Sequence, residues 1–387
     1  MSDSPPLGIY VHWPYCSRIC PYCDFNVVRD RGRTAEPAAL AKAIVLDLRA
    51  HRALTGPRRL ASVYLGGGTP SLMAPDQAAA IIAEARALWD AADDLEITLE
   101  ANPTDAEADR FGAFADAGVN RLSLGVQSLD DAALAFLGRN HSAADAVRAA
   151  VAARAAFPRL SLDLIYALPG QSEAAWALEL DAAVALGAEH ISPYQLTIET
   201  GTAFDRAVRR GQWAPPGGDL GAGLFETTQE VLGRHGFHAY EVSNHARGVA
   251  ARSRHNLIYW RGHDYVGVGP GAHGRLTLDG ERIATRAADH IGAYLQRVAE
   301  TGTGWAGREV LNPGEAAEER LLMGLRTDEG VQMTQLAPLG LGSGHPTIET
   351  LAVAGLVRVD GGRLIATPSG RLVLDRITAE LALAESV

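Results

Sequence analysis

All three cysteines of the chain lie within eight residues near its start. Three residues separate Cys16 from Cys20, and two separate Cys20 from Cys23. Thiolates are soft ligands for iron-sulfur clusters, zinc or copper(I), and three thiolates on one short loop can converge on a single site. A four-iron cluster held by three thiolates leaves one iron open to a small molecule. We therefore predict a cluster with an open iron on this loop.

Structural zinc is the alternative for this loop. His12 lies four residues before the first cysteine and could complete a tetrahedral ligand set. Structural zinc sites usually draw ligands from two separated pairs, whereas no second pair of cysteines follows here. We favour the cluster, and expect nearby aromatic side chains to shield it from water. These are Trp13, Tyr15, Tyr22 and Phe25.

The elements that would position this loop form a repeated strand-helix pattern. Apolar runs predict strands at residues 8–13, 61–65, 95–100, 121–125, 160–166 and 190–194. Helical patterns fall at 36–54, 75–88, 105–117 and 173–186, and a further helical pattern ends at residue 155. This alternation predicts a parallel sheet with right-handed crossovers, either doubly wound or curved into a barrel. Cysteine-, glycine- or carboxylate-bearing segments follow the first four strands, so we expect one site at the carboxyl ends of the strands.

The remainder of the chain divides less clearly. A helical pattern at 219–235 precedes segments rich in glycine, histidine and aromatic residues. From residue 311, two helical stretches lead into a hairpin that turns at Gly361-Gly362, which is typical of a small winged-helix-like module. We predict three parts, comprising residues 1–235, 236–310 and 311–387.

Composition excludes several classes of protein. The formal net charge of −11 over 387 residues disfavours general binding to nucleic acids. No run approaches the roughly 20 apolar residues of a membrane helix, and the N-terminus lacks the pattern of a signal peptide. Three closely spaced cysteines argue for reduced thiolates. We therefore expect a cytoplasmic protein.

The cysteine pattern, with an aromatic residue before the third cysteine, resembles the signature of the radical S-adenosylmethionine superfamily. Six segments are similar to its coproporphyrinogen-dehydrogenase-like branch, at residues 10–16, 20–26, 66–71, 100–103, 124–128 and 163–169. The resemblance spans nearly the whole chain. It implies a partial (β/α)6 TIM-like barrel with a small C-terminal winged-helix-like α+β domain. It also implies a [4Fe-4S] cluster whose open iron binds S-adenosylmethionine, which the cluster cleaves reductively to a 5′-deoxyadenosyl radical.

The same resemblance assigns site residues. The metal ligands are Cys16, Cys20 and Cys23, and the S-adenosylmethionine residues are Tyr10, Tyr22, Gly67, Gly68, Thr69, Glu100, Gln127, Arg139 and Asp163. The glycines lack side chains, so backbone amides could approach the ligand, although such a run is often only a tight turn. Glu100 ends a strand, where it could accept hydrogen bonds from the ligand or simply favour the start of a helix. A salt bridge is the alternative for Arg139 and for Asp163.

Two features distinguish the subgroups of this branch. The dehydrogenase subgroup carries a fourth cysteine where this chain has Phe25, and a longer segment before the first strand. By contrast, residues 254–260 resemble the His-Asn-x-x-Tyr-Trp motif of the haem-chaperone subgroup, which implies haem contacts. The implied contacts are His255, Asn256, Tyr259 and Trp260, with His245, His263 and His273 as alternative iron ligands.

The resemblance thus implies a chaperone that binds haem and passes it to apo-proteins, with membrane-bound respiratory enzymes among the candidate recipients. It implies an electron donor for the cluster, no nucleic-acid partner, and a homodimer as a possible assembly. Any contact with a membrane would be peripheral and through partners. An oxygen-independent coproporphyrinogen III dehydrogenase is the alternative, and a zinc-stabilised nucleic-acid-binding protein is the third hypothesis.

Overall fold

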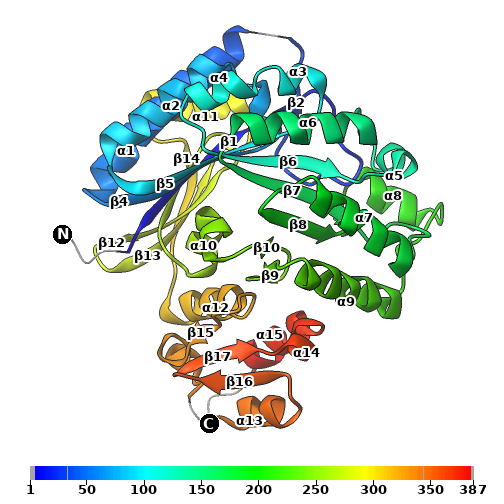
Figure 1. Cartoon of the computed structure of the whole chain (residues 1–387). Coiled ribbons are helices and arrows are strands. Elements are labelled where there is room, and N and C mark those ends of the chain that lie inside the picture. The colour runs from blue at the N-terminus through cyan, green and yellow to red at the C-terminus, as the bar shows by residue number, and fades with distance from the viewer. Residues whose placement is uncertain (1–4, 33, 343, 385–387) are drawn as a thin grey trace.

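Six parallel strands follow one another both in sequence and in space in the computed structural model, which describes residues 5–32, 34–342 and 344–384. They are β1 (Leu7–Trp13), β4 (Arg59–Gly67), β5 (Asp90–Ala101), β6 (Arg121–Gln127), β7 (Arg159–Tyr166) and β8 (His190–Gln195). Most of their residues are buried, as expected for a sheet whose two faces are both covered. The predicted partial barrel of six strand-helix units is confirmed (Figure 1).

Helices cover the outer face of this sheet (Figure 1). They are α1 (Ala35–Thr55), α2 (Pro75–Leu88), α3 (Asp105–Ala108), α4 (Phe111–Asp116), α6 (Ala143–Ala156), α7 (Glu173–Ala185) and α9 (Gly218–Arg234). Two further helices, α5 (Asp131–Phe136) and α8 (Ala203–Arg209), lie at the carboxyl ends of the strands. The helix predicted over 105–117 is instead two short helices. Arg110 separates them, and its guanidinium bonds the carbonyls of Ser71 and Met73.

The segment after α9 extends both edges of the sheet. Two short strands, β10 (His245–Ala246) and β9 (His238–Ala239), continue the sheet beyond β8. At the other edge β11 (Tyr265–Val268) pairs in parallel with β1, followed by β12 (His273–Leu278), β13 (Glu281–Ala287) and β14 (Trp305–Val310). Helix α11 (Ile291–Thr301) packs against α1. Residues 236–310 therefore complete the sheet, and the division at 235 and 310 stays a prediction.

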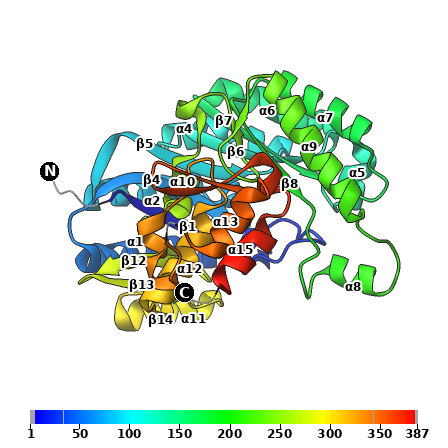
Figure 2. The same cartoon turned by 90° about the horizontal axis from the view of Figure 1, so that it is seen from below.

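Helix α10 (Arg254–Trp260) packs against β1 and β4 on the side that faces the C-terminal module (Figure 2). Its first turn is fixed by a buried carboxylate, because Glu96 accepts the backbone amides of Arg254 and His255 at 3.1 Å each. Glu96 also pairs with Arg159 at 2.6 Å. The helix is thus anchored to β5 and β7 at the end of the barrel opposite to the strand carboxyl ends.

The C-terminal module has its own buried core. It comprises α12 (Pro313–Gly324), β15 (Val331–Gln332), α13 (Pro346–Val353), β16 (Val357–Asp360), β17 (Arg363–Ala366), α14 (Pro368–Arg371) and α15 (Leu374–Ala382). The predicted hairpin is present. Gly361 and Gly362 have φ of 55° and 76°, the positive values that a two-residue type I′ turn requires. Among the described residues, no helix has the length and apolar character to cross a membrane.

Candidate functional site

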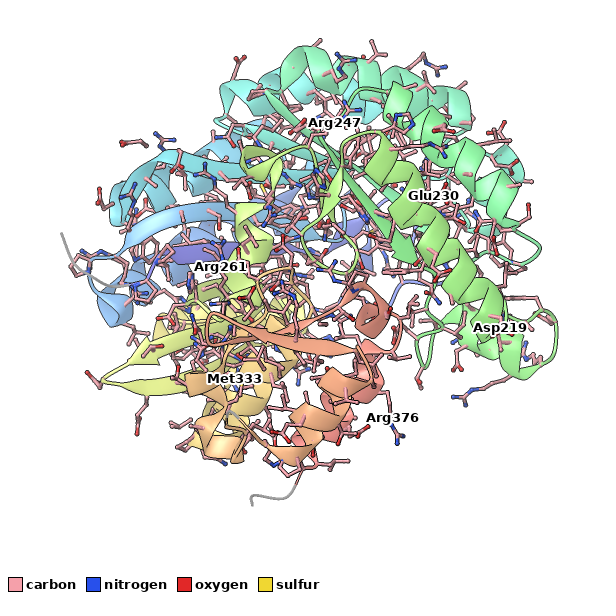
Figure 3. All side chains as sticks on the ribbon, turned by 60° about the horizontal axis from the view of Figure 1, so that its bottom comes forward. Asp219, Glu230, Arg247, Arg261, Met333 and Arg376 are labelled. Atoms are coloured by element: carbon pink, nitrogen blue, oxygen red, sulfur yellow. The ribbon has the colours of Figure 1, made fainter. Side chains whose placement is uncertain are left out.

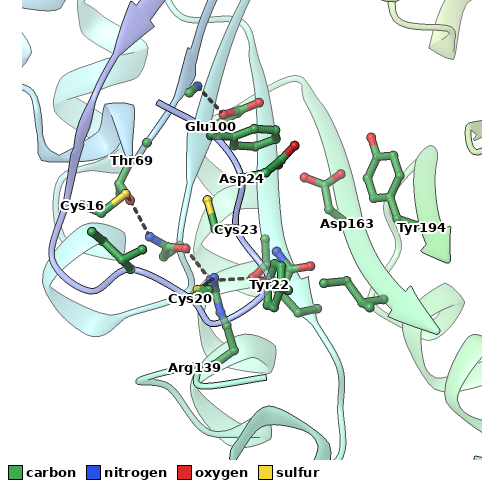
Figure 4. A pocket seen from close by; sticks show the side chains of 18 of the residues that line it. Cys16, Cys20, Tyr22, Cys23, Asp24, Thr69, Glu100, Arg139, Asp163 and Tyr194 are labelled. Carbon is green, nitrogen blue, oxygen red and sulfur yellow. Dashed lines mark hydrogen bonds between the residues drawn. The ribbon is translucent and has the colours of Figure 1, made fainter. Parts of the chain in front are cut away.

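A cavity of about 500 Å³ opens at the carboxyl ends of the parallel strands (Figure 4). The residues around it come from the cysteine loop, from the ends of β4, β5, β6, β7 and β8 (His190–Gln195), and from the loop that carries Arg139. Eleven of the twelve predicted cluster and S-adenosylmethionine residues line it, namely Cys16, Cys20, Tyr22, Cys23, Gly67, Gly68, Thr69, Glu100, Gln127, Arg139 and Asp163. Residues far apart in sequence therefore share one site, as the strand-end argument predicts.

The cysteine loop is closed at its base by a short parallel pairing. Strands β2 (Tyr15–Cys16) and β3 (Val28–Arg29) pair, so the segment between them projects as one loop. All three sulfur-bearing side chains line the cavity. Burial raises the pKa of the Cys16 thiol to about 11 and also raises the pKa of Cys23. Binding of a metal centre must therefore displace thiol protons at neutral pH.

The zinc alternative finds no support in this geometry. The His12 ring lies between the Tyr10 hydroxyl at 3.0 Å and the Asn26 carbonyl at 2.8 Å, and it does not line the cavity. Among the described residues, no three histidine, cysteine or acidic side chains come close enough to hold a single metal ion. Of the aromatic residues expected to shield the loop, Tyr22 and Phe25 line the cavity, whereas Trp13 and Tyr15 pack in the core.

Arg139 ties the cysteine loop to the strand ends. Its guanidinium donates to the Cys20 sulfur at 3.3 Å, to the Gly125 carbonyl at 3.3 Å and to the Asn102 side-chain oxygen. Asn102 in turn donates to Thr69 at 3.1 Å. Neither Arg139 nor Asp163 forms an ion pair within the described part of the chain, so the salt-bridge alternative is not observed for either residue.

The glycine run serves close packing within the protein. The amides of Gly67, Gly68 and Thr69 donate to Glu100, to the Trp13 carbonyl and to the Tyr15 carbonyl. All three amides therefore have partners within the protein, and the assignment of these residues to S-adenosylmethionine stays a prediction. A Cβ atom on Gly67 would lie 2.5 Å from the His12 ring, and one on Gly68 would lie 2.7 Å from the Tyr15 carbonyl oxygen. The glycines therefore let β4 approach the start of the cysteine loop.

Glu100 presents a carboxylate to the cavity from the end of β5. It accepts hydrogen bonds from the Tyr64 hydroxyl at 2.7 Å and from the Gly67 amide at 3.0 Å. Burial raises the pKa of Glu100 to about 7, although the Tyr64 hydrogen bond opposes this shift. A carboxylate with this pKa can accept hydrogen bonds from hydroxyl or amino groups of a ligand.

Asp163 and Gln127 lie near Glu100 on neighbouring strands. Asp163 accepts a hydrogen bond of 2.8 Å from Ser123, and burial raises its pKa. Gln127 has a φ of 65°, a conformation that is unfavourable for a residue with a side chain. Such strain is concentrated at functional sites, where surrounding contacts hold it in place.

The other predicted site residues lie outside this cavity. Tyr10 is behind it, with its ring 6.3 Å from the rings of Tyr64 and His255. The predicted haem contacts belong to α10, below the barrel, and none of them lines the cavity; they are His255, Asn256, Tyr259 and Trp260. The structure therefore separates the predicted haem residues from the predicted cluster and S-adenosylmethionine residues.

His255 is buried, with both ring nitrogens engaged. Its Nδ1 lies 2.8 Å from the Ser62 hydroxyl, and its Nε2 lies 2.6 Å from the Tyr259 hydroxyl. Burial lowers the pKa of His255 to about 3, so the ring is neutral. In this arrangement His255 has no free nitrogen to offer an iron atom. His245 is also buried, and its Nε2 lies 3.3 Å from Gln229, whereas His273 is exposed on β12.

Several lining residues were not singled out from the sequence. Tyr64, Asn102, Ser123 and Tyr194 contribute polar atoms to the cavity. Asn102 could have been found, because it belongs to the segment 100–103 that follows a strand. The other three lie within strands that are buried on both faces, so residue alternation does not reveal which side chains face the cavity.

Comparison with known proteins agrees with this geometry. The Radical SAM superfamily model matches residues 10–181, and the HemN C-terminal domain model matches residues 311–373. A protein of Mycobacterium tuberculosis named heme chaperone HemW is 36% identical over 97% of this chain and 95% of its own. The chain belongs to the HemW family. A HemW protein of Escherichia coli is 38% identical over 76% of this chain and 77% of its own.

An animal protein matches this chain as well. A bovine mitochondrial protein, radical S-adenosyl methionine domain-containing protein 1, is 40% identical over 98% of this chain and 88% of its own. The coproporphyrinogen III oxidase HemN of Escherichia coli superposes with a TM-score of 0.79 over 98% of this chain and 91% of its own, at 21% identity. That likeness establishes the shared fold.

Radical S-adenosylmethionine proteins carry a [4Fe-4S] cluster and S-adenosylmethionine, and the cavity of this HemW-family chain fits them. The three cysteine side chains line one space, and Glu100 of β5 and Asp163 of β7 line the same space. The buried Nε of Arg139 has no partner within the described residues. Thiolates suit the cluster, and carboxylates suit the hydroxyl and amino groups of the second cofactor.

Proposed function

We propose that this protein is a haem chaperone that binds a [4Fe-4S] cluster and S-adenosylmethionine and delivers haem to apo-proteins. The observation that carries the proposal is the 36% sequence identity, over 97% of this chain, to proteins named heme chaperone HemW. Phe25 supports it, because this exposed side chain stands where the dehydrogenase subgroup has a further cysteine. Haem-accepting apo-proteins and an electron donor are the partners that this function requires.

In this proposal Cys16, Cys20 and Cys23 hold the cluster. Glu100 and Asp163 orient S-adenosylmethionine by accepting hydrogen bonds, and Arg139 holds Cys20 in place beside the strand ends. When bound, the cluster supplies an electron and the open iron position. The surrounding protein restricts access of water to both cofactors, with Tyr22 covering one side of the cavity.

Haem titration tests the proposal. We expect the purified protein to bind haemin in a one-to-one ratio, measured by absorption spectroscopy. His255→Ala removes the motif histidine, and His290→Ala is the matched control, on an exposed histidine that is not among the predicted iron ligands. Thermal unfolding of both variants is needed, because His255 also supports α10 through Ser62. Absence of stoichiometric haem binding by the unmodified protein would overturn the proposal.

The fold shared with HemN keeps the dehydrogenase as a second candidate. Its reaction would remove hydrogen from propionate side chains of coproporphyrinogen III before decarboxylation. An anaerobic assay of the reconstituted protein for protoporphyrinogen distinguishes the two functions. Sustained turnover would reverse our ranking, whereas haem binding without turnover supports the chaperone.

A further inference from the structure

A second, smaller cavity lies between the end of α10 and the C-terminal module. Its volume is about 200 Å³. The α10 side contributes Trp260, Arg261 and His263, and the module contributes Arg320, Thr327, Glu329, Gly330, Gln332, Gln335 and Arg363. Figure 3 shows Arg261 on this side of the molecule, together with Met333 and Arg376 of the module. No residue of the strand-end cavity lines it.

This cavity carries uncompensated positive charge. Arg320 forms no ion pair with any described residue, and its Nη1 donates to the Trp260 carbonyl at 3.0 Å. Arg363 donates to the carbonyl oxygens of Glu329 and Gly330 and likewise has no carboxylate partner within the described ranges. Arg261 pairs with the Glu329 side chain. Three arginines therefore face one carboxylate, which leaves two positive charges in excess.

Two buried donors on the cavity wall lack acceptors. Trp260 Nε1 and Arg320 Nε have no hydrogen-bond partner among the described residues. Buried donors without acceptors are costly and uncommon in folded proteins. Burial and the neighbouring guanidinium of Arg282 lower the pKa of Arg320 to about 10. An oxyanion in the cavity would compensate the positive charge of the lining arginines, which water cannot do.

His263 adds a further polar group to the same wall. Its ring is half-buried and makes no hydrogen bond to the part of the chain that the structure describes. It follows the motif helix by three residues, beside Trp260. The C-terminal end of the motif therefore lines the same cavity as Arg320 and Arg363 of the module. A ligand in this cavity can contact the motif and these arginines together.

We propose that this cavity binds the carboxylate of a haem propionate, with Arg320 and Arg363 as its cationic contacts. The inference rests on the proposed haem chaperone function. Planar guanidinium groups bind carboxylates through two parallel hydrogen bonds, which gives both affinity and orientation. The cavity is too small for a porphyrin, so it receives the acid group while the macrocycle stays outside. The Glu329 carboxylate pairs with Arg261, and neither Arg320 nor Arg363 forms an ion pair with it.

Haemin and haemin dimethyl ester, titrated into the full-length protein, test the inference. The ester lacks the negative charges but keeps the macrocycle and the iron. We expect the unmodified protein to bind haemin about tenfold more tightly than the ester. Arg320→Gln and Arg363→Gln should each remove most of this preference without weakening binding of the ester. Arg376→Gln, on an exposed arginine of the same module, is the matched control.

The outcomes separate the two proposals. Equal binding of haemin and its ester by the unmodified protein would overturn the propionate site and leave the chaperone standing. Failure to bind either compound would overturn the chaperone. A titration with inorganic phosphate, followed by tryptophan fluorescence, tests the oxyanion site without haem. Loss of that signal in Arg320→Gln supports the site, and an unchanged signal in a variant that folds normally contradicts it.

Discussion

Tyr64 connects Glu100 to His255. Its hydroxyl donates a 2.7 Å hydrogen bond to Glu100, and its ring stacks on the His255 ring with 4.9 Å between centroids. The proposed S-adenosylmethionine cavity and the motif helix below the barrel are therefore in contact through one side chain.

The Tyr64→Phe substitution tests this link. Removing the hydroxyl leaves Glu100 with one hydrogen bond from the described residues, the Gly67 amide, and raises its pKa further. We expect about tenfold weaker binding of S-adenosylmethionine to the reconstituted protein, measured by equilibrium dialysis. Tyr166→Phe is the control, since this buried tyrosine stacks on Trp176 and does not line the cavity. Wild-type affinity in Tyr64→Phe would contradict the role of this hydrogen bond.

Binding of S-adenosylmethionine should depend on pH through Glu100. Burial raises the pKa of Glu100 to about 7, so the side chain is protonated below that pH and ionised above it. An ionised carboxylate accepts stronger hydrogen bonds, so affinity should rise between about pH 6 and pH 8. Glu100→Gln should bind weakly and lack this rise. S-adenosylmethionine itself also titrates. An equal rise of affinity with pH in Glu100→Gln would therefore show that Glu100 is not the titrating group.

Each cysteine should be required for the cluster. Cys16→Ser, Cys20→Ser and Cys23→Ser should lower the iron content of anaerobically reconstituted protein from about four atoms per chain to below one. Iron and acid-labile sulfide analysis measures this. His12→Gln is the informative control, because a zinc site would lose metal on that substitution and a cluster would not. A colourless protein loaded with zinc would contradict the cluster.

The anchor of α10 should contribute strongly to stability. Glu96 is 1% exposed and binds Arg159 and two backbone amides of α10, so Glu96→Ala leaves buried charge and donors unpaired. We expect a loss of about 3 kcal/mol in the free energy of unfolding by denaturant. Glu84→Ala, which breaks the surface pair with Arg49, should cost less than about 1 kcal/mol. Similar losses in the two variants would contradict this assignment.

The same carboxylate predicts the acid sensitivity of the fold. Burial alone would raise the pKa of Glu96, but Arg121, Arg159 and the two amides lower it overall. Its stabilising contribution is therefore present above the ordinary pKa of a glutamate and is lost as pH falls through the lowered value. Stability of the wild type should fall in this acidic range, and that of Glu96→Gln should change less.

The parallel sheet was predictable because its signals are local. Each of the six strands is an apolar run next to a helical pattern. Helix α2 spans Pro75–Leu88, the range that the sequence pattern predicts. The residues of the strand-end cavity followed from this topology and from the family resemblance. Their hydrogen bonds did not, because the partners of Glu100 and Arg139 come from elements that are distant in sequence.

The segment between α9 and the module could not be predicted from local pattern. Strands β9 and β10 have two residues each, and β11 has four, which is too short for a clear period. Their places at opposite edges of one sheet depend on contacts with β8 and β1. The burial of His255 could not be predicted for the same reason, because its hydrogen-bond partner Ser62 lies on β4, far away in the sequence.

The position of β11 has a consequence for synthesis of the chain. β1 leads directly into the cysteine loop, and it pairs with β4 on one side and with β11, more than 250 residues later, on the other. Until the ribosome has released residues 265–268, one edge of β1 lacks its partner and its backbone groups remain unpaired. The strand that leads into the cysteine loop therefore gains its second partner only after roughly two thirds of the protein has been made.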